Sequence, residues 1–274
     1  MAYSTIEVSC TGARGSITLS RPDKLNPLGA STLGELVEAT AFFDSRPEVK
    51  VVVVGGSGRA FSAGADLAGM GRAEGAPGSA MIARKGAEAG RRMADAIEAM
   101  RAVTIASIHG HCVGGAVVLA AACDLRVAAD DTVFSIPEVD LGIPLTWGGI
   151  PRLVREIGPA LTRELVMTCR PFGAAEAKDA GFLNRVVPTS RLDDEVEQLV
   201  SQLEAKSAYT LFCTKRQIDA VTEGMVATYR SWSEAELILA AGRDSESREA
   251  ATAYLKRVGQ NPRPAIEGGR HGDR

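Results

Sequence analysis

The first half of the chain alternates short runs of β-branched residues with longer stretches of helical periodicity, and this alternation constrains the fold most strongly. The run from Lys50 to Val54 contains four consecutive valines. A strand that is apolar on both faces is typical of the centre of a parallel sheet, because both faces of such a sheet are covered. A second apolar run, Val103 to Ile108, follows a helical pattern. The sequence therefore predicts crossover units of strand, helix and strand around a central sheet.

Further elements are expected on both sides of these runs. Thr32 and Glu35 have the spacing of a capping box, which predicts the start of a helix. Met93, Ile97 and Met100 recur at helical spacing within residues 81–100 and are expected in the core. The other expected elements are a hairpin of strands 6–10 and 16–19, a helix over 116–123, and strands over 125–128, 132–136 and 185–187.

No internal repeat, low-complexity block or long linker divides the chain. After about residue 158 the strand signals become rare and helical patterns dominate. We therefore expect an α/β core over residues 1–200, a helical C-terminal region over 201–258 and a flexible tail over 259–274.

The composition excludes several classes of partner. The 274 residues include 31 Lys and Arg against 34 Asp and Glu, so we expect no bulk attraction to nucleic acids or to anionic membranes. The longest apolar run, Cys112 to Cys123, is shorter than the ~18 residues that span a bilayer. The N-terminus lacks a basic stretch followed by an apolar segment, so a cytoplasmic protein is expected.

Cysteine and histidine usage indicates neither a disulfide framework nor a metal site. The five cysteines are scattered and are never spaced as Cys-x-x-Cys, and the three histidines do not supply a cluster of metal ligands. We therefore expect no intrinsic metal.

Two glycine-containing turns follow predicted strands and precede helices, where crossover sheets bind their ligands. The first, residues 55–67, has Phe61 where a dinucleotide-binding fingerprint requires its third glycine, which argues against a nicotinamide-dependent oxidoreductase. The second, residues 109–116, carries Gly114 and Gly115 at a helix start, where unpaired N–H groups favour negative charge. Each turn alone is equally a tight connection, but two together can hold one developing oxyanion between them.

These turns and several later motifs resemble the enoyl-CoA hydratase/isomerase (crotonase) family in order and spacing. The resemblance covers roughly residues 6–257, and the joint occurrence of its motifs makes it specific. It rests on the segments RPDKLN (21–26), FSAGADL (61–67), HGHCVGGA (109–116), CDLR (123–126), PEVDLGIP (137–144), GG (148–149), RL (152–153) and AAEA (174–177).

The resemblance implies an α/β fold with a crotonase-like ββα spiral core, and a C-terminal helical region through which family members usually form trimers or dimers of trimers. It implies a CoA thioester as substrate and no separate cofactor. By position, the amides of Ala63 and Gly115 would stabilise the thioester oxyanion. The other residues implied to contact the substrate or its CoA are Lys24, Leu25, Asn26, Ala65, Asp66, Leu67, Gly114, Val118, Pro137, Leu141 and Trp147.

The chain departs from the hydratases of this family at one of their two catalytic glutamates. The first position falls on Val118, which neither binds water nor transfers a proton, whereas the second is retained as Glu138. A single carboxylate suffices for a proton shift, and this pattern is similar to the Δ3,Δ2-enoyl-CoA isomerase branch. Dienoyl-CoA isomerases carry further aspartates that would fall at Val118 and Thr146, and both are missing.

We therefore expect an enzyme that shifts a double bond in an enoyl-CoA, with Glu138 as the proton carrier. Hydration of a trans-2-enoyl-CoA and acyl-CoA binding without turnover are the alternatives. Asp140 is either an extra acid or a solvated or inter-subunit charge. His109 and His111 are either proton carriers or structural residues of the second turn.

Overall fold

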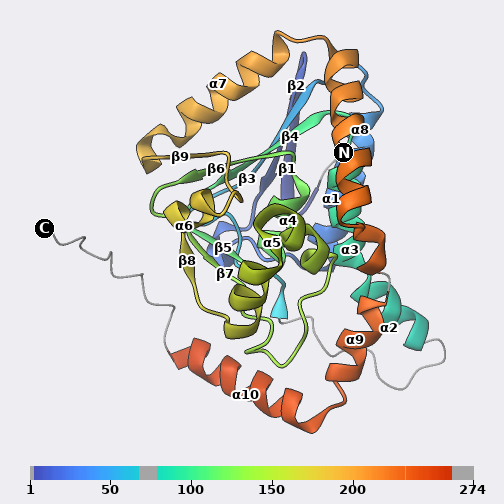
Figure 1. Ribbon diagram of the computed structural model, residues 1–274, viewed down its shortest axis with the longest axis vertical. Coiled ribbons are helices and arrows are strands. Elements are labelled where there is room, and N and C mark those ends of the chain that lie inside the picture. Colours follow the sequence, from blue (N-terminus) through green and yellow to red (C-terminus); the bar gives the residue numbers. More distant parts are fainter. Residues whose placement is uncertain (1–2, 68–78, 232, 261–274) are drawn as a thin grey trace, which may run out of the picture.

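The computed structural model describes residues 3–67, 79–231 and 233–260 (Figure 1). Its larger sheet has the strand order β1-β2-β3-β4-β6-β9. β1 and β2 form the predicted antiparallel hairpin, and every later pair of neighbours is parallel. The strands are β1 (Ile6–Thr11), β2 (Arg14–Leu19), β3 (Val51–Gly56), β4 (Val103–Ile108), β6 (Leu125–Ala129) and β9 (Arg185–Val187).

The valine run forms β3, which is a central strand as predicted. It pairs with β2 on one side and β4 on the other, and Val51, Val52 and Val54 are buried. Val51 packs against α7 (Leu192–Glu204), whereas Val52 and Val54 belong to the larger core on the opposite face. Both faces are therefore covered, which explains why the run does not alternate.

The larger core contains α1 (Ala30–Asp44), α3 (Ala89–Ala99) and α4 (Gly115–Ala122). Every residue of α4 is buried, so this short helix lies within the core. A second sheet joins β5 (His111–Val113), β7 (Val133–Ser135) and β8 (Phe172–Gly173). Neither β8 nor β5, which lies within the predicted second turn, was foreseen as a strand. The other helices are α2 (Ser79–Ala87), α5 (Gly149–Thr168), α6 (Ala174–Asp179), α8 (Ala208–Met225), α9 (Glu234–Ala241) and α10 (Ser245–Gln260).

Two predicted helix features differ from the structure. The capping box is wrong, because α1 begins at Ala30 after Gly29, and the Glu35 carboxylate instead accepts hydrogen bonds from Ser4 and Thr5. The helical pattern within residues 81–100 forms two helices rather than one continuous helix, α2 and α3, with Glu88 between them.

The C-terminal helices are spread over the outside of the molecule, with α8 and α10 towards opposite ends in Figure 1. In Figure 1, α9 and α10 lie at the end of the molecule where α2 is also found. Helix α10 continues to Gln260, two residues into the predicted tail, and residues 261–274 lie outside the described part. The limits proposed between core and helical region stay a prediction. Within the described ranges, no helix is both long and apolar enough to cross a membrane.

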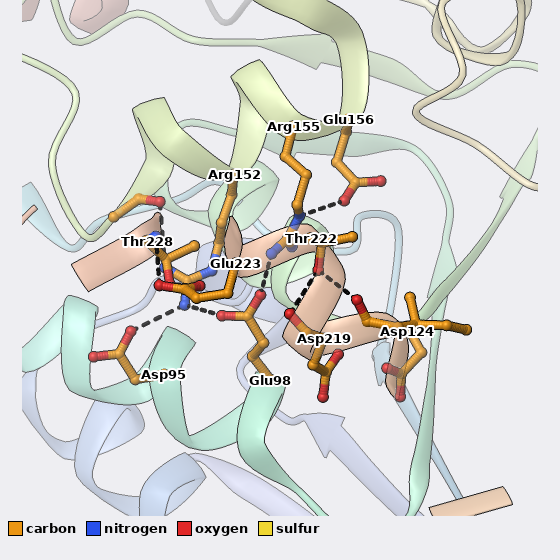
Figure 2. Close-up of polar contacts among 12 residues, drawn as sticks. Asp95, Glu98, Asp124, Arg152, Arg155, Glu156, Asp219, Thr222, Glu223 and Thr228 are labelled. Carbon is orange, nitrogen blue, oxygen red and sulfur yellow. Dashed lines mark hydrogen bonds and ion pairs between the residues drawn. The ribbon is translucent and has the colours of Figure 1, made fainter. Parts of the chain in front are cut away.

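A buried ion-pair network joins α5 to α3. Figure 2 shows Arg152 and Arg155 of α5 pointing at carboxylates of α3. The fully buried Arg152 guanidinium contacts Asp95 at 2.9 Å and Glu98 at 2.5 Å, and Arg155 contacts Glu98 at 2.6 Å. Burial alone would raise the pKa of Glu98, but the two arginines outweigh it and lower that pKa. The network therefore holds the start of α5 in place. This helix directly follows the loop of residues 136–148.

Candidate active site

A cavity of about 40 Å³ lies where the two glycine turns meet the segment that follows β7. One carboxylate, the backbone of two residues from the glycine turns and a set of apolar side chains surround it. Its lining residues in the described chain are Ala65, Gly115, Val118, Glu138, Ile143, Leu145, Thr146, Trp147 and Ile238. The cavity is therefore mostly apolar with a few convergent polar groups, which is the usual character of a small-molecule site.

The two glycine turns are hydrogen-bonded to each other. The Ser62 N–H donates to the His111 carbonyl at 3.0 Å, and the Val113 N–H donates to the Ser62 carbonyl at 3.2 Å. Gly64 has φ +87°, and a Cβ there would lie 3.5 Å from the Gly115 nitrogen and overlap the Val113 carbonyl. This close approach of the turns needs glycine at position 64.

The structure corrects the predicted pair of oxyanion donors. The Ala63 N–H donates to the Leu25 carbonyl at 2.8 Å, so the prediction that Ala63 supplies an amide to the site is wrong. Ala65, two residues later, lines the cavity, and within the described residues its N–H has no hydrogen-bond acceptor. The same holds for the N–H of Gly115, the first residue of α4. Ala65 and Gly115 thus become the candidate pair, and the second lies at the positive end of a helix dipole.

Glu138 enters the cavity from a tight turn after β7. Its side chain is buried, with 8% of the residue exposed. The Glu138 carbonyl accepts from the amides of Leu141 and Ile143, both at 3.0 Å, and these bonds hold the turn. Its carboxylate lies against Gly114, where a Cβ would be 3.2 Å from Glu138 Cδ. The predicted proton carrier therefore lies beside the residue that precedes Gly115.

Val118 occupies the cavity wall one helical turn after Gly115. It is fully buried, and its Cγ2 lies close to Gly149. Glu138 is consequently the only carboxylate among the described lining residues.

The predicted CoA-binding residues separate into two groups. Asn26 is only 2% exposed, and its side chain accepts from the Arg21 N–H and donates to the carbonyls of Ser57, Ala60 and Phe61. The prediction of Asn26 as a ligand contact is therefore wrong, because this side chain connects two loops. Lys24 is exposed, and Leu25, Asp66 and Leu67 are half-buried, so all four keep accessible surface.

The remaining predicted residues lie on the segments that form the cavity. Trp147 and Val118 line it, and Gly114 contacts the Glu138 carboxylate. Pro137 and Leu141 flank Glu138 on the same turn and are absent from the described lining.

The alternative acid and bases lie outside the described lining. Asp140 forms an ion pair with Arg257 of α10 at 2.6 Å, within the same chain. His109 Nε2 lies 3.0 Å from the Gly58 carbonyl, which connects the two glycine turns. His111 belongs to β5, opposite Val133. These positions favour structural roles for the three residues.

Sequence reasoning did not assign four of the lining residues, or one carboxylate beside them, to the site, although it compared Thr146 with an aspartate position of dienoyl-CoA isomerases. Ile143, Leu145 and Thr146 follow Glu138 closely, so their nearness in sequence was an available signal. Ile238 comes from α9, which no motif connected with the site. Glu234, one turn earlier on α9, accepts the Gly148 N–H at 2.7 Å; its burial raises its pKa to about 7.

Comparison with known proteins identifies the family to which this fold belongs. The sequence profile of the enoyl-CoA hydratase/isomerase family matches residues 12–261. A crotonyl-CoA hydratase of Syntrophomonas wolfei is 33% identical over 260 residues, covering 94% of this chain and 97% of the relative. A peroxisomal Δ(3,5)-Δ(2,4)-dienoyl-CoA isomerase of Arabidopsis thaliana is 32% identical over 269 residues, covering 93% and 95%.

A solved enoyl-CoA hydratase/isomerase structure from Xanthobacter autotrophicus Py2 superposes with a TM-score of 0.81 at 28% identity, covering 95% of this chain and 94% of that one. The fold is thus the predicted crotonase fold, an α/β core with a helical C-terminal portion. The chain belongs to the enoyl-CoA hydratase/isomerase family and is an enzyme that processes acyl-CoA.

Proposed function

We propose that this enzyme moves a double bond in an unsaturated acyl-CoA by a 1,3-proton shift. The observation that supports this reaction is the composition of the cavity. Glu138 is the only carboxylate among its described lining residues, and it lies next to the amides of Ala65 and Gly115. One base beside two backbone donors suits the formation and collapse of an enolate.

The proposed reaction needs no oxidant or other co-reactant. The thioester oxygen of a 3-enoyl-CoA accepts hydrogen bonds from the Ala65 and Gly115 amides. Glu138 removes a proton from C2, and the electron pair passes into a dienolate whose negative charge is greatest on that oxygen. Glu138 then returns the proton to C4, which gives the 2-enoyl-CoA. The amides stabilise the intermediate without reorganisation because the backbone already holds them in place.

We further propose that Lys24, Leu25, Asp66 and Leu67 bind the CoA portion. Their accessible surface and their position beside the Ala65 turn support this role. The Lys24 ammonium would balance phosphate charge at a protein that carries a net charge of −3.

Hydration of a 2-enoyl-CoA is the second candidate, because relatives with hydratase names have about the same identity as the isomerase. Two carboxylates normally hold the attacking water in such enzymes. Val118 occupies one of those positions here, and its isopropyl group offers water no hydrogen bond. The proton shift is therefore the better supported reaction.

Incubation with a 3-enoyl-CoA and, separately, with a 2-enoyl-CoA tests the proposal, with the products identified by mass spectrometry and NMR. A 2-enoyl product of unchanged mass from the first substrate is expected. A mass increase of one water as the dominant reaction would instead assign the hydratase. Binding of both substrates without any product would indicate an acyl-CoA-binding protein.

We also propose that the chain self-associates through its C-terminal helices. Ile218, Val221 and Met225 lie on α8 with exposed side chains, and contiguous exposed apolar surface is typical of an interface. Light scattering coupled to size exclusion is expected to give the mass of a trimer or a multiple of it.

A further inference from the structure

Trp147 is the largest side chain that lines the cavity, and two helices hold its indole ring. A Cβ on Gly115 of α4 would lie 2.8 Å from the ring atoms Cε3 and Cη2, and a Cβ on Gly90 of α3 would overlap the ring from the other side. Because Gly90 and Gly115 lack side chains, the indole packs closely against the backbone of both helices. A side chain at either glycine would therefore displace the half-buried ring.

The backbone of Trp147 is held as firmly as its ring. Its φ of +63° is uncommon for a residue other than glycine. The buried Arg152 guanidinium donates to the carbonyls of Trp147 at 3.5 Å and Gly148 at 3.2 Å. The Gly148 N–H in turn donates to Glu234. Since Arg152 is itself paired with Glu98, the backbone of Trp147 is linked to the network in Figure 2.

Helix α9 completes this arrangement. Glu234, in its first turn, holds the loop of Trp147, and Ile238, one turn later, lines the cavity directly. An ion pair between Glu236 and Arg84 joins α9 to α2. The wall of the cavity is therefore built from packed elements, with Trp147 and Ile238 on it.

We infer that Trp147 is a specificity-determining residue that restricts this enzyme to short acyl groups. This inference rests on the acyl-CoA function proposed above. A cavity of about 40 Å³ has room for about three or four water-sized groups, since each needs ~10–15 Å³ of such volume. We therefore expect an acyl group of about four carbons to fill it, and longer chains to meet the indole or Ile238.

Equilibrium binding of saturated acyl-CoAs with 4, 6, 8 and 10 carbons, measured by calorimetry, tests this inference. Saturated thioesters undergo neither isomerisation nor hydration, so the result does not depend on which reaction the enzyme catalyses. The wild type is expected to bind the 10-carbon thioester at least ~10-fold more weakly than the 4-carbon one, because a packed wall rejects extra methylenes. Trp147→Ala is expected to abolish or reverse this order.

Two further variants complete the experiment. Trp147→Phe keeps an aromatic ring between Gly90 and Gly115 and is expected to shift the length limit by a smaller amount, so it decides the question if Trp147→Ala does not fold. Met167→Ala removes an exposed side chain from the last turn of α5 and serves as the control with the wild-type order. A general loss of stability would weaken binding of all four thioesters alike, whereas the inference requires a change in their ratio.

Equal binding of all lengths by the wild type, or a wild-type order in both Trp147 variants, would overturn the length limit and leave the proposed function intact. A failure of the wild type to bind any acyl-CoA would contradict the proposed function itself.

Discussion

The Glu138 carboxylate lies against the backbone of Gly114, where a Cβ atom would be 3.2 Å from Glu138 Cδ and closer still to Oε1. Gly114 also has φ +52°, and a residue with a side chain would be strained in this backbone conformation. We therefore expect Gly114→Ala to displace the carboxylate and to lower turnover by about 100-fold, because a misplacement of ~1 Å costs about that much. Turnover of a 3-enoyl-CoA and thermal unfolding are measured on the same preparation.

Gly34 provides the matched control. It lies inside α1, and a Cβ there would meet nothing within 4 Å. Gly34→Ala is expected to raise the free energy of unfolding by ~0.5–1 kcal/mol and to leave turnover unchanged. Folded Gly114→Ala protein with wild-type turnover would show that Glu138 does not need the glycine.

Val118→Glu tests whether the missing carboxylate is what limits hydration. The new side chain would replace a fully buried valine that lines the cavity. We expect hydration of a 2-enoyl-CoA to rise above the wild-type level if the carboxylate binds water. An unpaired charge there would cost several kcal/mol, so the free energy of unfolding is measured as well.

Val118→Gln introduces a side chain of nearly the same size as that of Val118→Glu but without a charge. Comparing the two variants separates the effect of side-chain size from that of ionisation. The expected order of hydration rates places Val118→Glu above Val118→Gln. Wild-type hydration as fast as isomerisation would mean that Glu138 alone positions the water, and the assignment of the proton shift would then be wrong.

Glu35 predicts how stability changes in acid. Its burial raises its pKa, but hydrogen bonds from Ser4 and Thr5 outweigh this and lower the pKa from 4.5 to about 2. A lowered pKa in the folded state stabilises the fold above pH 4.5, and this contribution is lost as pH falls from 4.5 towards 2. We expect Glu35→Gln to lower the free energy of unfolding by ~1 kcal/mol at pH 7, a small value because solvent screens a partly exposed group. Near pH 2 we expect no difference from the wild type, because the contribution of the Glu35 carboxylate has been lost there.

Urea unfolding of the wild type and Glu35→Gln across this pH range is the measurement. Glu38, an exposed neighbour on α1, is the control, and Glu38→Gln is expected to show no such difference. A gap between wild type and Glu35→Gln that is constant with pH would contradict the assignment.

From Glu234 we expect the opposite pH dependence of the free energy of unfolding, near neutral pH. Burial raises its pKa from 4.5 to about 7, against the lowering effects of the Gly148 N–H, Arg152 and Arg91, while Asp95 adds to the rise. The folded protein therefore keeps a proton that the unfolded chain has lost between pH 4.5 and 7, so this contribution to stability falls as pH rises through that window. The expected loss is about 1 kcal/mol after allowance for solvent screening.

Glu234→Gln keeps an oxygen that accepts the Gly148 N–H but cannot ionise. The free energy of unfolding of Glu234→Gln is expected to lie below that of the wild type at pH 5 and above it at pH 8. A difference between the two proteins that does not change across this range would contradict the raised pKa.

Hydrophobic patterning was sufficient to predict most of the core. The valine run and the hairpin before it depend on local burial and pairing, so β3, β1 and β2 were foreseen. Strand β8 has only two residues, Phe172 and Gly173, and pairs with a strand almost forty positions earlier, which leaves no periodic signal. The start of α1 was missed because Glu35 finds its partners in the N-terminal segment.

Site residues could be predicted where a sequence motif identifies them. They could not be predicted where contacts with distant parts of the backbone determine which group faces the cavity. The nearness of Glu138 to the second glycine turn followed from the family resemblance. The choice between Ala63 and Ala65 depends on the Leu25 carbonyl, which a left-handed turn brings to the Ala63 amide. The packing of Trp147 between Gly90 and Gly115 joins three segments and has no local signature.

The most direct test of the central claim is the effect of Glu138→Gln on turnover and on binding. We expect turnover of a 3-enoyl-CoA to fall at least ~100-fold, because a general acid–base group contributes 10² to 10⁴, while the dissociation constant for a saturated four-carbon acyl-CoA stays within a few-fold of wild type. Near-wild-type turnover in the folded variant would remove Glu138 from the mechanism and contradict the proton shift proposed for this site.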